Sequence, residues 1–143
     1  MLPKIRSCVL DLLALREHSK FELQRKLIAK GFAIDDVHKV LQDLERQGLQ
    51  SDARFAESYI AMRRKRGFGP IRIKAELCER GVDKELGENF LAEYKSTWGE
   101  QVEVVRCKKF GKKNPRDLHE QAKQIRYLYY KGFDPSMIKG LFS

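Results

Sequence analysis

One short pattern occurs three times in this chain, and it constrains the fold more than any other feature of the sequence. Leu is followed by three residues, a Gly and an apolar residue in LIAKGF (27–32), LCERGV (77–82) and LYYKGF (128–133). The glycines are 50 and 51 residues apart, and a cation precedes each of them. Helices often end on a glycine in the left-handed conformation. The pattern therefore predicts three helix ends at a nearly constant period.

The sequence on both sides of each glycine repeats as well. An apolar pair follows at a constant distance, as Val40-Leu41, Phe90-Leu91 and Leu141-Phe142. Upstream, residues 8–16 correspond to 53–66 and approximately to 101–110, and hydrophobic residues recur there at helical spacing. A period of this length is typical of repeat arrays, whose copies stack because none has a large core of its own.

We therefore predict an all-α protein of three tandem three-helix repeats that form an elongated, curved array. The predicted repeats are residues 1–51, 52–99 and 100–143. Ser19 and Glu22 have the spacing of a capping box, in which two side chains accept backbone amides at one helix start. Acidic residues and X-Pro pairs predict further helix starts at Asp35, Asp83, Asn114-Pro115 and Asp134-Pro135.

Positive charge is concentrated in two blocks. Lys and Arg number 29 against 20 Asp and Glu, which gives a formal net charge of +9. Residues 58–75 hold six cations and no acid, residues 76–103 hold eight acids and three cations, and residues 104–116 again hold six cations and no acid. Such blocks favour a polyanion or an acidic protein surface as the partner. If about six cations met phosphates, log K would fall against log salt with a slope of roughly −4 to −5.

The segment RRKRGFGPIR (63–72) joins two predicted helices of the middle repeat. Gly67 is expected to end the first helix, Phe68 to pack at the corner and Gly69-Pro70 to start the second. A helix dipole explains one or two terminal cations but not four, so we interpret the joint as a contact surface, with a merely solvated face as the alternative. Nearby aromatic residues could stack on bases, although their helical spacing favours core packing. These aromatic residues are Phe68, Phe110, Tyr127, Tyr129 and Tyr130.

The ionisable residues do not indicate an enzyme. The three histidines and three cysteines are scattered, and the sequence contains no metal-binding or nucleotide-hydrolysis motif. We expect solvated histidines and no catalytic residue, metal or cofactor. No apolar run approaches the ~18 residues of a membrane span, and no signal peptide begins the chain. We therefore expect a cytoplasmic protein without a membrane partner.

The segment DARFAESYIAMRRKRGFGPIRIKAELCERGV (52–82) closely resembles the central signature of the RecX family, bacterial regulators of the RecA recombinase. HSKFELQRKLIAKGF (18–32) resembles the opening of the family's first unit, and IRYLYYKGF (125–133) the ending of its third. The positions in the central segment that match the family pattern are Asp52, Arg54, Phe55, Ala56, Tyr59, Arg63, Gly67, Phe68, Gly69, Pro70, Ile73, Glu76, Leu77, Arg80, Gly81 and Val82.

The resemblance implies a regulator that binds in the helical groove of the RecA–DNA filament and blocks strand exchange and ATP hydrolysis. It also implies some binding to DNA itself, single-stranded and, as an open alternative, double-stranded. A monomer is our default expectation for an array. The main alternative is a non-specific DNA-binding helical protein that acts without RecA, and a third is a structural scaffold with no salt-dependent binding.

Two sets of residues carry these predictions. The expected filament or DNA contacts are Arg54, Arg63, Arg64, Lys65, Arg66, Arg72, Lys74, Arg106, Lys108, Lys109, Lys112, Lys113 and Arg116. The expected structural turns are Gly31, Gly67, Gly69, Pro70, Gly81 and Gly132.

Overall fold

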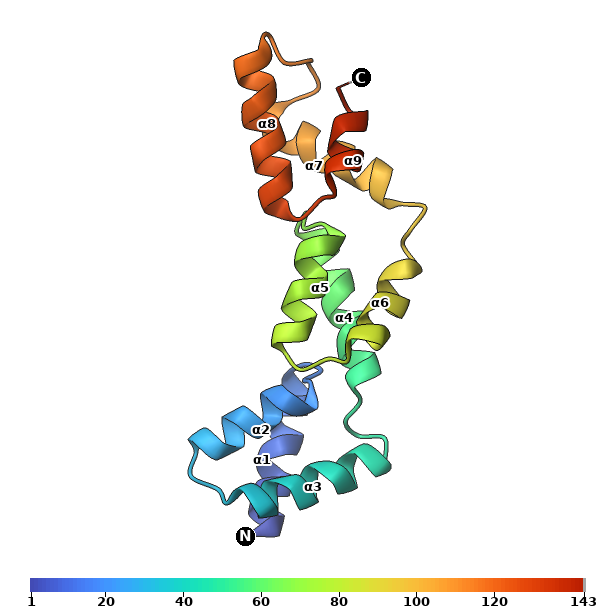
Figure 1. Cartoon of the computed structure of the whole chain (residues 1–143). Helices are drawn as coiled ribbons and strands as arrows, with labels where there is room; N and C mark the ends of the chain where they lie inside the picture. Colours follow the sequence, from blue (N-terminus) through green and yellow to red (C-terminus); the bar gives the residue numbers. More distant parts are fainter. Residues whose placement is uncertain (143) are drawn as a thin grey trace. The chain divides into compact units, whose positions relative to one another are not determined.

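A computed structural model describes residues 1–142 of the chain, and Ser143, the last residue of the third predicted repeat, lies outside the described residues. Within residues 1–142 there are nine helices and no strand, which confirms the predicted all-α class. The helices, drawn in Figure 1, are α1 (Leu2–Leu15), α2 (Lys20–Ala29), α3 (Ile34–Arg46), α4 (Asp52–Lys65), α5 (Pro70–Glu79), α6 (Lys84–Ala92), α7 (Trp98–Phe110), α8 (Leu118–Lys131) and α9 (Pro135–Gly140).

The chain divides into two compact units. The first comprises Met1–Tyr59 and Leu77–Gly87, and the second comprises Ile60–Glu76 and the residues from Glu88 on. The division runs through the predicted middle repeat, so each unit takes part of α4, α5 and α6. Compact units and sequence repeats are different divisions of a chain, and the predicted repeat boundaries stay a prediction.

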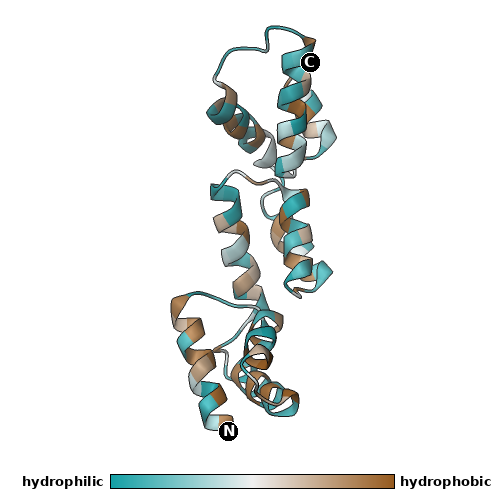
Figure 2. Ribbon diagram, turned by 90° about the vertical axis from the view of Figure 1, so that its left-hand side faces the viewer, coloured by the Kyte–Doolittle hydropathy of each residue, from teal (hydrophilic) through white to brown (hydrophobic). Residues whose placement is uncertain are grey.

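The core of the first unit is formed by the apolar faces of α1, α2 and α3. α3 packs on both of the other helices, and its buried residues recur at intervals of three and four, as expected for an amphipathic helix. Figure 2 shows that hydrophobic and hydrophilic residues share each of these helices. The buried cluster consists of Ile5, Val9, Leu23, Leu27, Val37, Val40, Leu41 and Leu44.

Aromatic side chains are prominent in the core of the second unit. Trp98 at the start of α7 is buried, and its ring meets the ring of Phe133 edge-on, with centroids 6.4 Å apart and planes at 70°. This arrangement suits the opposite charges of a ring's face and edge. α7, α8 and α9 contact one another and contribute the buried Val102, Leu128 and Ile138 respectively.

Three of the five predicted helix starts are confirmed, and those at Asp35 and Asn114-Pro115 are displaced. The Ser19–Glu22 capping box is complete. Asp83 accepts from the backbone N–H of Leu86 at 3.3 Å, and Asp134 accepts from that of Ser136. Asp35 lies in the first turn of α3, one residue after the helix begins, and makes no cap.

The start expected at Asn114-Pro115 is displaced along the chain. α8 begins at Leu118, and its N-cap is Asp117, whose carboxylate accepts from the backbone N–H of Glu120 at 2.8 Å. Asn114 and Pro115 would suit an N-cap and a first helical position, but Asp117, three residues on, is a second acceptor and carries a full negative charge. Asp117 satisfies one of the unpaired amides of the first turn, and Glu120 adds a negative charge to this turn.

His18 is buried, which corrects the expectation that the histidines are solvated. Its Nδ1 lies 3.0 Å from the carbonyl oxygen of Arg16, and its Nε2 lies 3.0 Å from Nζ of Lys26. A lysine ammonium can only donate, so Nε2 accepts and the ring proton lies on Nδ1. Burial holds the pKa of His18 below its usual range, and the charges of Arg16 and Lys26 act in the same direction, against the carbonyl hydrogen bond.

This environment predicts that the protein loses stability as the pH falls below about 6.5, the ordinary histidine pKa. The unfolded chain takes up a proton there while folded His18 resists it, so the unfolded state binds more protons in this window. Urea unfolding followed by circular dichroism at about pH 7.5 and pH 5.5 measures the loss. His18→Gln is expected to reduce the difference between the two pH values. An unchanged difference would assign it to other groups.

Equivalent contacts join consecutive repeats in the two units. In the first unit, the hydroxyl of Ser19 donates to the carbonyl oxygen of Arg80 at 2.7 Å. In the second, the backbone N–H of Gly69 donates to the carbonyl oxygen of Lys131 at 2.8 Å. Ser19 and Gly69 hold the same position, twelve residues before the patterned glycine of their own repeat, and each acceptor directly precedes the glycine of the next repeat. The glycine turns therefore dock one repeat on another.

The close approach at these joints leaves no room for side chains. Gly81 and Gly132 have φ angles of +77° and +101°, which favour glycine. A Cβ on Gly132 would lie 2.7 Å from the backbone nitrogen of Arg72, and one on Gly81 would lie 2.8 Å from Cγ of Phe21. At Gly69 a Cβ would lie 2.5 Å from the carbonyl oxygen of Gly132. The expected turn glycines thus also serve as contact points.

Candidate functional site

The basic segment at 63–72 forms a helix end with a hydrogen-bonded turn. The backbone N–H of Phe68 donates to the carbonyl of Arg63 at 3.1 Å, and that of Gly67 donates to the carbonyl of Arg64 at 2.9 Å. With Gly67 at a φ of +89°, this is a Schellman motif. α5 then starts at Pro70, whose missing N–H is no loss at a first helical position.

Two cations of this segment share one acid. Arg63 donates from Nε and Nη2 to the two oxygens of Glu76, both at 2.8 Å, and Arg72 donates from Nε to the same carboxylate at 3.2 Å. The Arg63 and Glu76 side chains are each 14% exposed. The ring of Phe68 lies 3.8 Å from the Arg63 guanidinium, 4.5 Å from that of Arg72 and 3.8 Å from Nζ of Lys131. Phe68 thus packs at the corner and holds three cations on its ring.

Arg64 has a structural contact of its own. Its guanidinium carbon lies 4.3 Å from the ring centroid of Tyr94 and 4.8 Å from that of Trp98, and Nη2 donates to the hydroxyl of Thr97 at 2.8 Å. Arg64 therefore anchors the end of α4 to the chain that enters α7. The run of four cations divides into two anchored arginines, Arg63 and Arg64, and two exposed residues, Lys65 and Arg66.

The second basic block is divided as well, and one member differs from expectation. Arg106 is 5% exposed, so it does not belong to an exposed basic surface. Its Nη2 lies 3.6 Å from Sγ of Cys107, and its Nε and Nη1 have no hydrogen-bond partner among residues 1–142. It lies on the face of α7 that also buries Val102 and Val105. The exposed members of the block are Lys108, Lys109, Lys112, Lys113 and Arg116, the last paired with Glu120.

Arg54 and Lys74, the remaining predicted contacts, have partners within the protein. In the first unit, Arg54 donates to Glu17 at 3.2 Å and to the carbonyl of Gly48 at 2.8 Å. In the second unit, Lys74 pairs with Glu88 at 2.7 Å. Arg54 thus belongs to a different compact unit from the rest of the predicted set.

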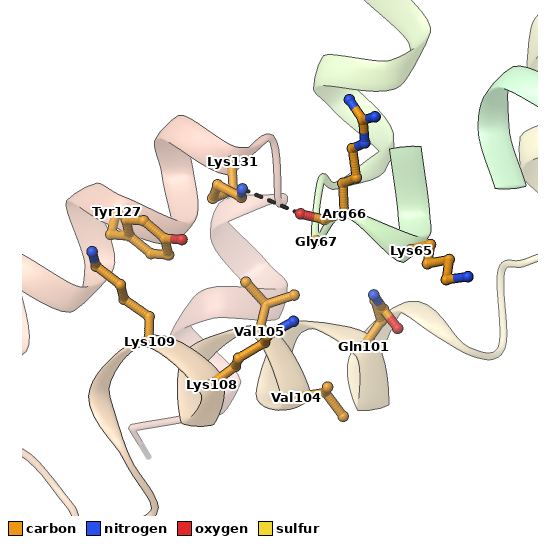
Figure 3. A pocket seen from close by; sticks show the side chains of 10 residues that line it. All are labelled: Lys65, Arg66, Gly67, Gln101, Val104, Val105, Lys108, Lys109, Tyr127 and Lys131. Carbon is orange, nitrogen blue, oxygen red and sulfur yellow. Dashed lines mark hydrogen bonds between the residues drawn. The ribbon is translucent and has the colours of Figure 1, made fainter. Parts of the chain in front are cut away.

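A cavity in the second unit is lined by exposed cations of both blocks, Lys65 and Arg66 from the first and Lys108 and Lys109 from the second. It has a volume of about 320 Å³ and lies between the end of α4, α7 and α8 (Figure 3). Its polar lining includes Lys65, Arg66, Gln101, Lys108, Lys109, Tyr127 and Lys131. Sequence reasoning missed Gln101 and Lys131 as members of this site, and for Tyr127 it favoured core packing over stacking on bases. The one available signal for Lys131 was the cation that precedes each patterned glycine.

The aromatic residues near the blocks also have different surroundings. Phe110 and Tyr127 pack edge-on, with centroids 5.4 Å apart. Tyr129 and Tyr130 are 65% and 67% exposed, so core packing does not describe these two. Arg72 lies against Tyr130, and hydrogen bonding and charge from Arg72 lower the pKa of the Tyr130 hydroxyl.

Residues 1–142 contain no group of three or more His, Cys, Asp and Glu side chains that could hold a metal ion. In the same residues no helix is both long enough and apolar enough to cross a membrane.

The fold and the site define a helical repeat protein with a basic cavity. Three family models match the chain: the first three-helix domain of RecX at residues 6–44, the second at 51–91 and the third at 100–141. The chain belongs to the RecX family of regulatory proteins. The family resemblance of segment 52–82 and the three three-helix repeats are thereby confirmed.

Individual relatives agree with the family models. The regulatory protein RecX of Pseudomonas putida is 41% identical over 139 residues, which cover 97% of this chain and 89% of the relative. That of Pseudomonas entomophila is 40% identical, with 97% and 90% covered. The crystal structure of RecX from Lactobacillus salivarius superimposes with a TM-score of 0.82 at 23% identity, covering 99% of this chain and 94% of that one. At this identity the crystal structure supports the fold alone.

Proposed function

We propose that this chain is a non-enzymatic regulator that binds the RecA–DNA filament and suppresses strand exchange and ATP hydrolysis. The observation that carries the proposal is family membership over 97% of the chain, at 41% identity to a protein named as a regulatory protein. The proposal places the protein in the cytoplasm and takes the monomer as the binding species.

The surface chemistry of the second unit supports a polyanionic partner. Exposed cations come from the end of α4, the end of α7 and the loop that follows, whereas Arg63, Arg64 and Arg72 are held by Glu76 or by aromatic rings. We therefore assign filament contact first to the exposed cations. The anchored arginines act mainly by shaping the turn that presents them. Arg106 is left out of the contact surface because it is buried.

Inhibition of RecA-driven ATP hydrolysis on single-stranded DNA tests the proposal. Lys65→Glu with Arg66→Glu changes the first block, and Lys112→Glu with Lys113→Glu changes the second. Each pair is exposed and carries no ion pair within residues 1–142. We expect each double variant to raise the concentration for half-inhibition by about tenfold or more, because contacts with phosphates are lost.

Lys30→Glu with Lys39→Glu is the matched control, since both residues are exposed in the first unit and the net charge changes equally. It is expected to stay within about twofold of the wild type, as rim charges away from a contact contribute little. Failure of the wild type to inhibit would overturn the proposal. Tighter binding to naked DNA than to RecA-coated DNA at equal salt would instead favour a non-specific DNA-binding protein.

A further inference from the structure

Three lysines project toward the cavity of the second unit. Figure 3 shows Lys108 and Lys109 extending from α7 and Lys131 from α8, while the guanidinium of Arg66 points away from the cavity. Arg66 presents its backbone carbonyl instead, which accepts from Nζ of Lys131 at 3.5 Å. Lysine side chains of two helices thus line one cavity.

The charge of these lysines is not neutralised by acids of the protein. None of the three forms an ion pair within residues 1–142, and no acidic residue lines the cavity. Nζ of Lys131 lies 3.8 Å from the ring centroid of Phe68 and 5.8 Å from that of Tyr127, and Nζ of Lys109 lies 5.4 Å from that of Tyr127. Such ring contacts attract the ammonium groups but do not neutralise their charge. Burial lowers the pKa of Lys131, and the nearby charges of Arg72, Arg63 and Lys109 lower it further. An anion in the cavity would relieve this repulsion.

Part of the cavity lining is apolar. Val104 is 53% exposed although it is hydrophobic, and Val105 lies beside it. Gly67 contributes no side chain, and a Cβ there would lie 3.4 Å from Cγ2 of Val105. The volume of about 320 Å³ lies at the small end of the range for ligand sites. A lining that combines apolar side chains with lysines suits a ligand with an apolar part and an anionic part.

A hydroxyl group completes the lining. Figure 3 shows the hydroxyl of Tyr127 directed toward the space between the helices. Phe110 packs edge-on against the Tyr127 ring at 88° and so fixes its orientation. The hydroxyl can donate or accept a hydrogen bond and can therefore meet a base edge or a phosphate oxygen.

We propose that this cavity binds one unstacked nucleotide of single-stranded DNA. Its phosphate lies among the ammonium groups of Lys108, Lys109 and Lys131, its base lies on Val104 and Val105, and the Tyr127 hydroxyl makes a hydrogen bond to it. The inference rests on the proposed function in taking nucleic acid as the partner. A base inside a duplex cannot reach the valines, so single strands are preferred over double strands.

Fluorescence anisotropy of a labelled oligothymidylate of about 15 nucleotides tests the proposal, with titrations at several salt concentrations. Lys108→Gln with Lys109→Gln is expected to weaken binding about tenfold and to reduce the magnitude of the log–log salt slope by about 1.4, or 0.7 for each lost phosphate contact. Lys95→Gln with Lys123→Gln is the control, because both lysines are exposed in the same unit and neither lines the cavity. Its slope is expected to match the wild type. Equal slopes for the two double variants would overturn the proposal.

Tyr127→Phe separates the hydroxyl from the fold, because the ring and its contact with Phe110 remain. We expect a weaker affinity for the single strand, by about fivefold, with the salt slope unchanged, since no charge is lost. Unchanged affinity would show that the Tyr127 hydroxyl makes no hydrogen bond to a nucleotide in the cavity, and would overturn the proposal. A loss confined to the duplex of the same length would do so too.

Competition experiments identify the class of anion that the cavity binds. Thymidine monophosphate, ATP and a hexaglutamate peptide are each added to the complex with the labelled strand. The proposal expects little displacement by any of them at the concentration of unlabelled strand that displaces half of the label. Equal displacement by ATP would make the site one for free nucleotides, and equal displacement by the peptide would make it one for acidic protein segments. Either outcome overturns the inference.

The RecA assay, run in parallel, separates this inference from the proposed function. Inhibition by the wild type together with normal oligonucleotide binding by the Lys108→Gln, Lys109→Gln variant would overturn the cavity assignment alone. Absence of inhibition together with the expected loss of binding in that variant would overturn the filament-regulator function and leave the nucleotide site in place.

Discussion

Gly132→Ala is expected to lower the free energy of unfolding by about 3 kcal/mol, because two costs add at this position. A non-glycine residue in the left-handed region costs about 1–2 kcal/mol, and Gly132 has a φ of +101°. Forcing atoms into a filled space costs a further 1–3 kcal/mol or so. The new Cβ would meet the Cβ of Arg72 and would lie 2.7 Å from its backbone nitrogen, which cannot rotate away.

Gly31→Ala is the matched control for this prediction. Gly31 holds the same place in the first repeat, with a φ of +94°, but within residues 1–142 a Cβ there would meet no atom within 4 Å beyond the adjoining chain. It is expected to cost only about 1–2 kcal/mol, the conformational part alone. Urea unfolding followed by circular dichroism compares the two variants, and fluorescence of the buried Trp98 reports on the second unit. Equal losses would show that the joint tolerates a methyl group.

Glu76→Ala should be nearly as damaging, with an expected loss of about 2–3 kcal/mol. It removes the carboxylate that Arg63 holds with two hydrogen bonds of 2.8 Å and that Arg72 holds with a third. Breaking a buried ion pair costs about 3–5 kcal/mol, because the remaining charge stays unpaired. The Arg63 and Glu76 side chains are each 14% exposed, so water can partly solvate the remaining arginine charge, and the expected loss of stability is smaller than this range.

Two further variants test whether the loss of stability comes from the Arg63 charge that is left without its carboxylate. Glu45→Ala removes the acid of the exposed Lys20–Glu45 pair and is expected to cost less than about 1 kcal/mol. Combining Glu76→Ala with Arg63→Met should recover part of the loss, because one unpaired guanidinium then disappears. If the double variant is less stable than Glu76→Ala, the arginine is held mainly by the ring of Phe68.

The helix ends could be predicted from the sequence because the interactions that form them are local. A patterned glycine, a capping box and an Asp before a helix each act within a few residues, so Gly31, Ser19 and Asp134 are recognisable without tertiary information. The helix start predicted at Asn114-Pro115 was wrong for an equally local reason. A second acceptor three residues on, Asp117, was the better cap.

The roles of the cations could not be predicted, because they depend on residues far away in sequence. Arg64 is anchored by Trp98, Arg72 by its contacts with Tyr130, and Arg106 is buried by the packing of α7. Charge patterning counts these residues with Lys108, which is free of such contacts within the described chain. Lys131 enters the cavity only because α8 packs beside α7.

The close contacts at Gly81 and Gly132 limit which residues the turns can accept, both in evolution and in design. The turns at Gly81 and Gly132 are each contacted closely by the preceding repeat, whereas in the described part of the chain a Cβ built on Gly31 would have no such neighbour. Selection should therefore hold the second and third glycines strictly and relax at the first. An additional repeat inserted between two existing ones must fit both of its neighbours. Before its second helix it needs a small donor, such as the glycine N–H or the serine hydroxyl seen here, for the carbonyl of the following repeat. It also needs a glycine turn whose preceding carbonyl can accept from the donor of the repeat before it.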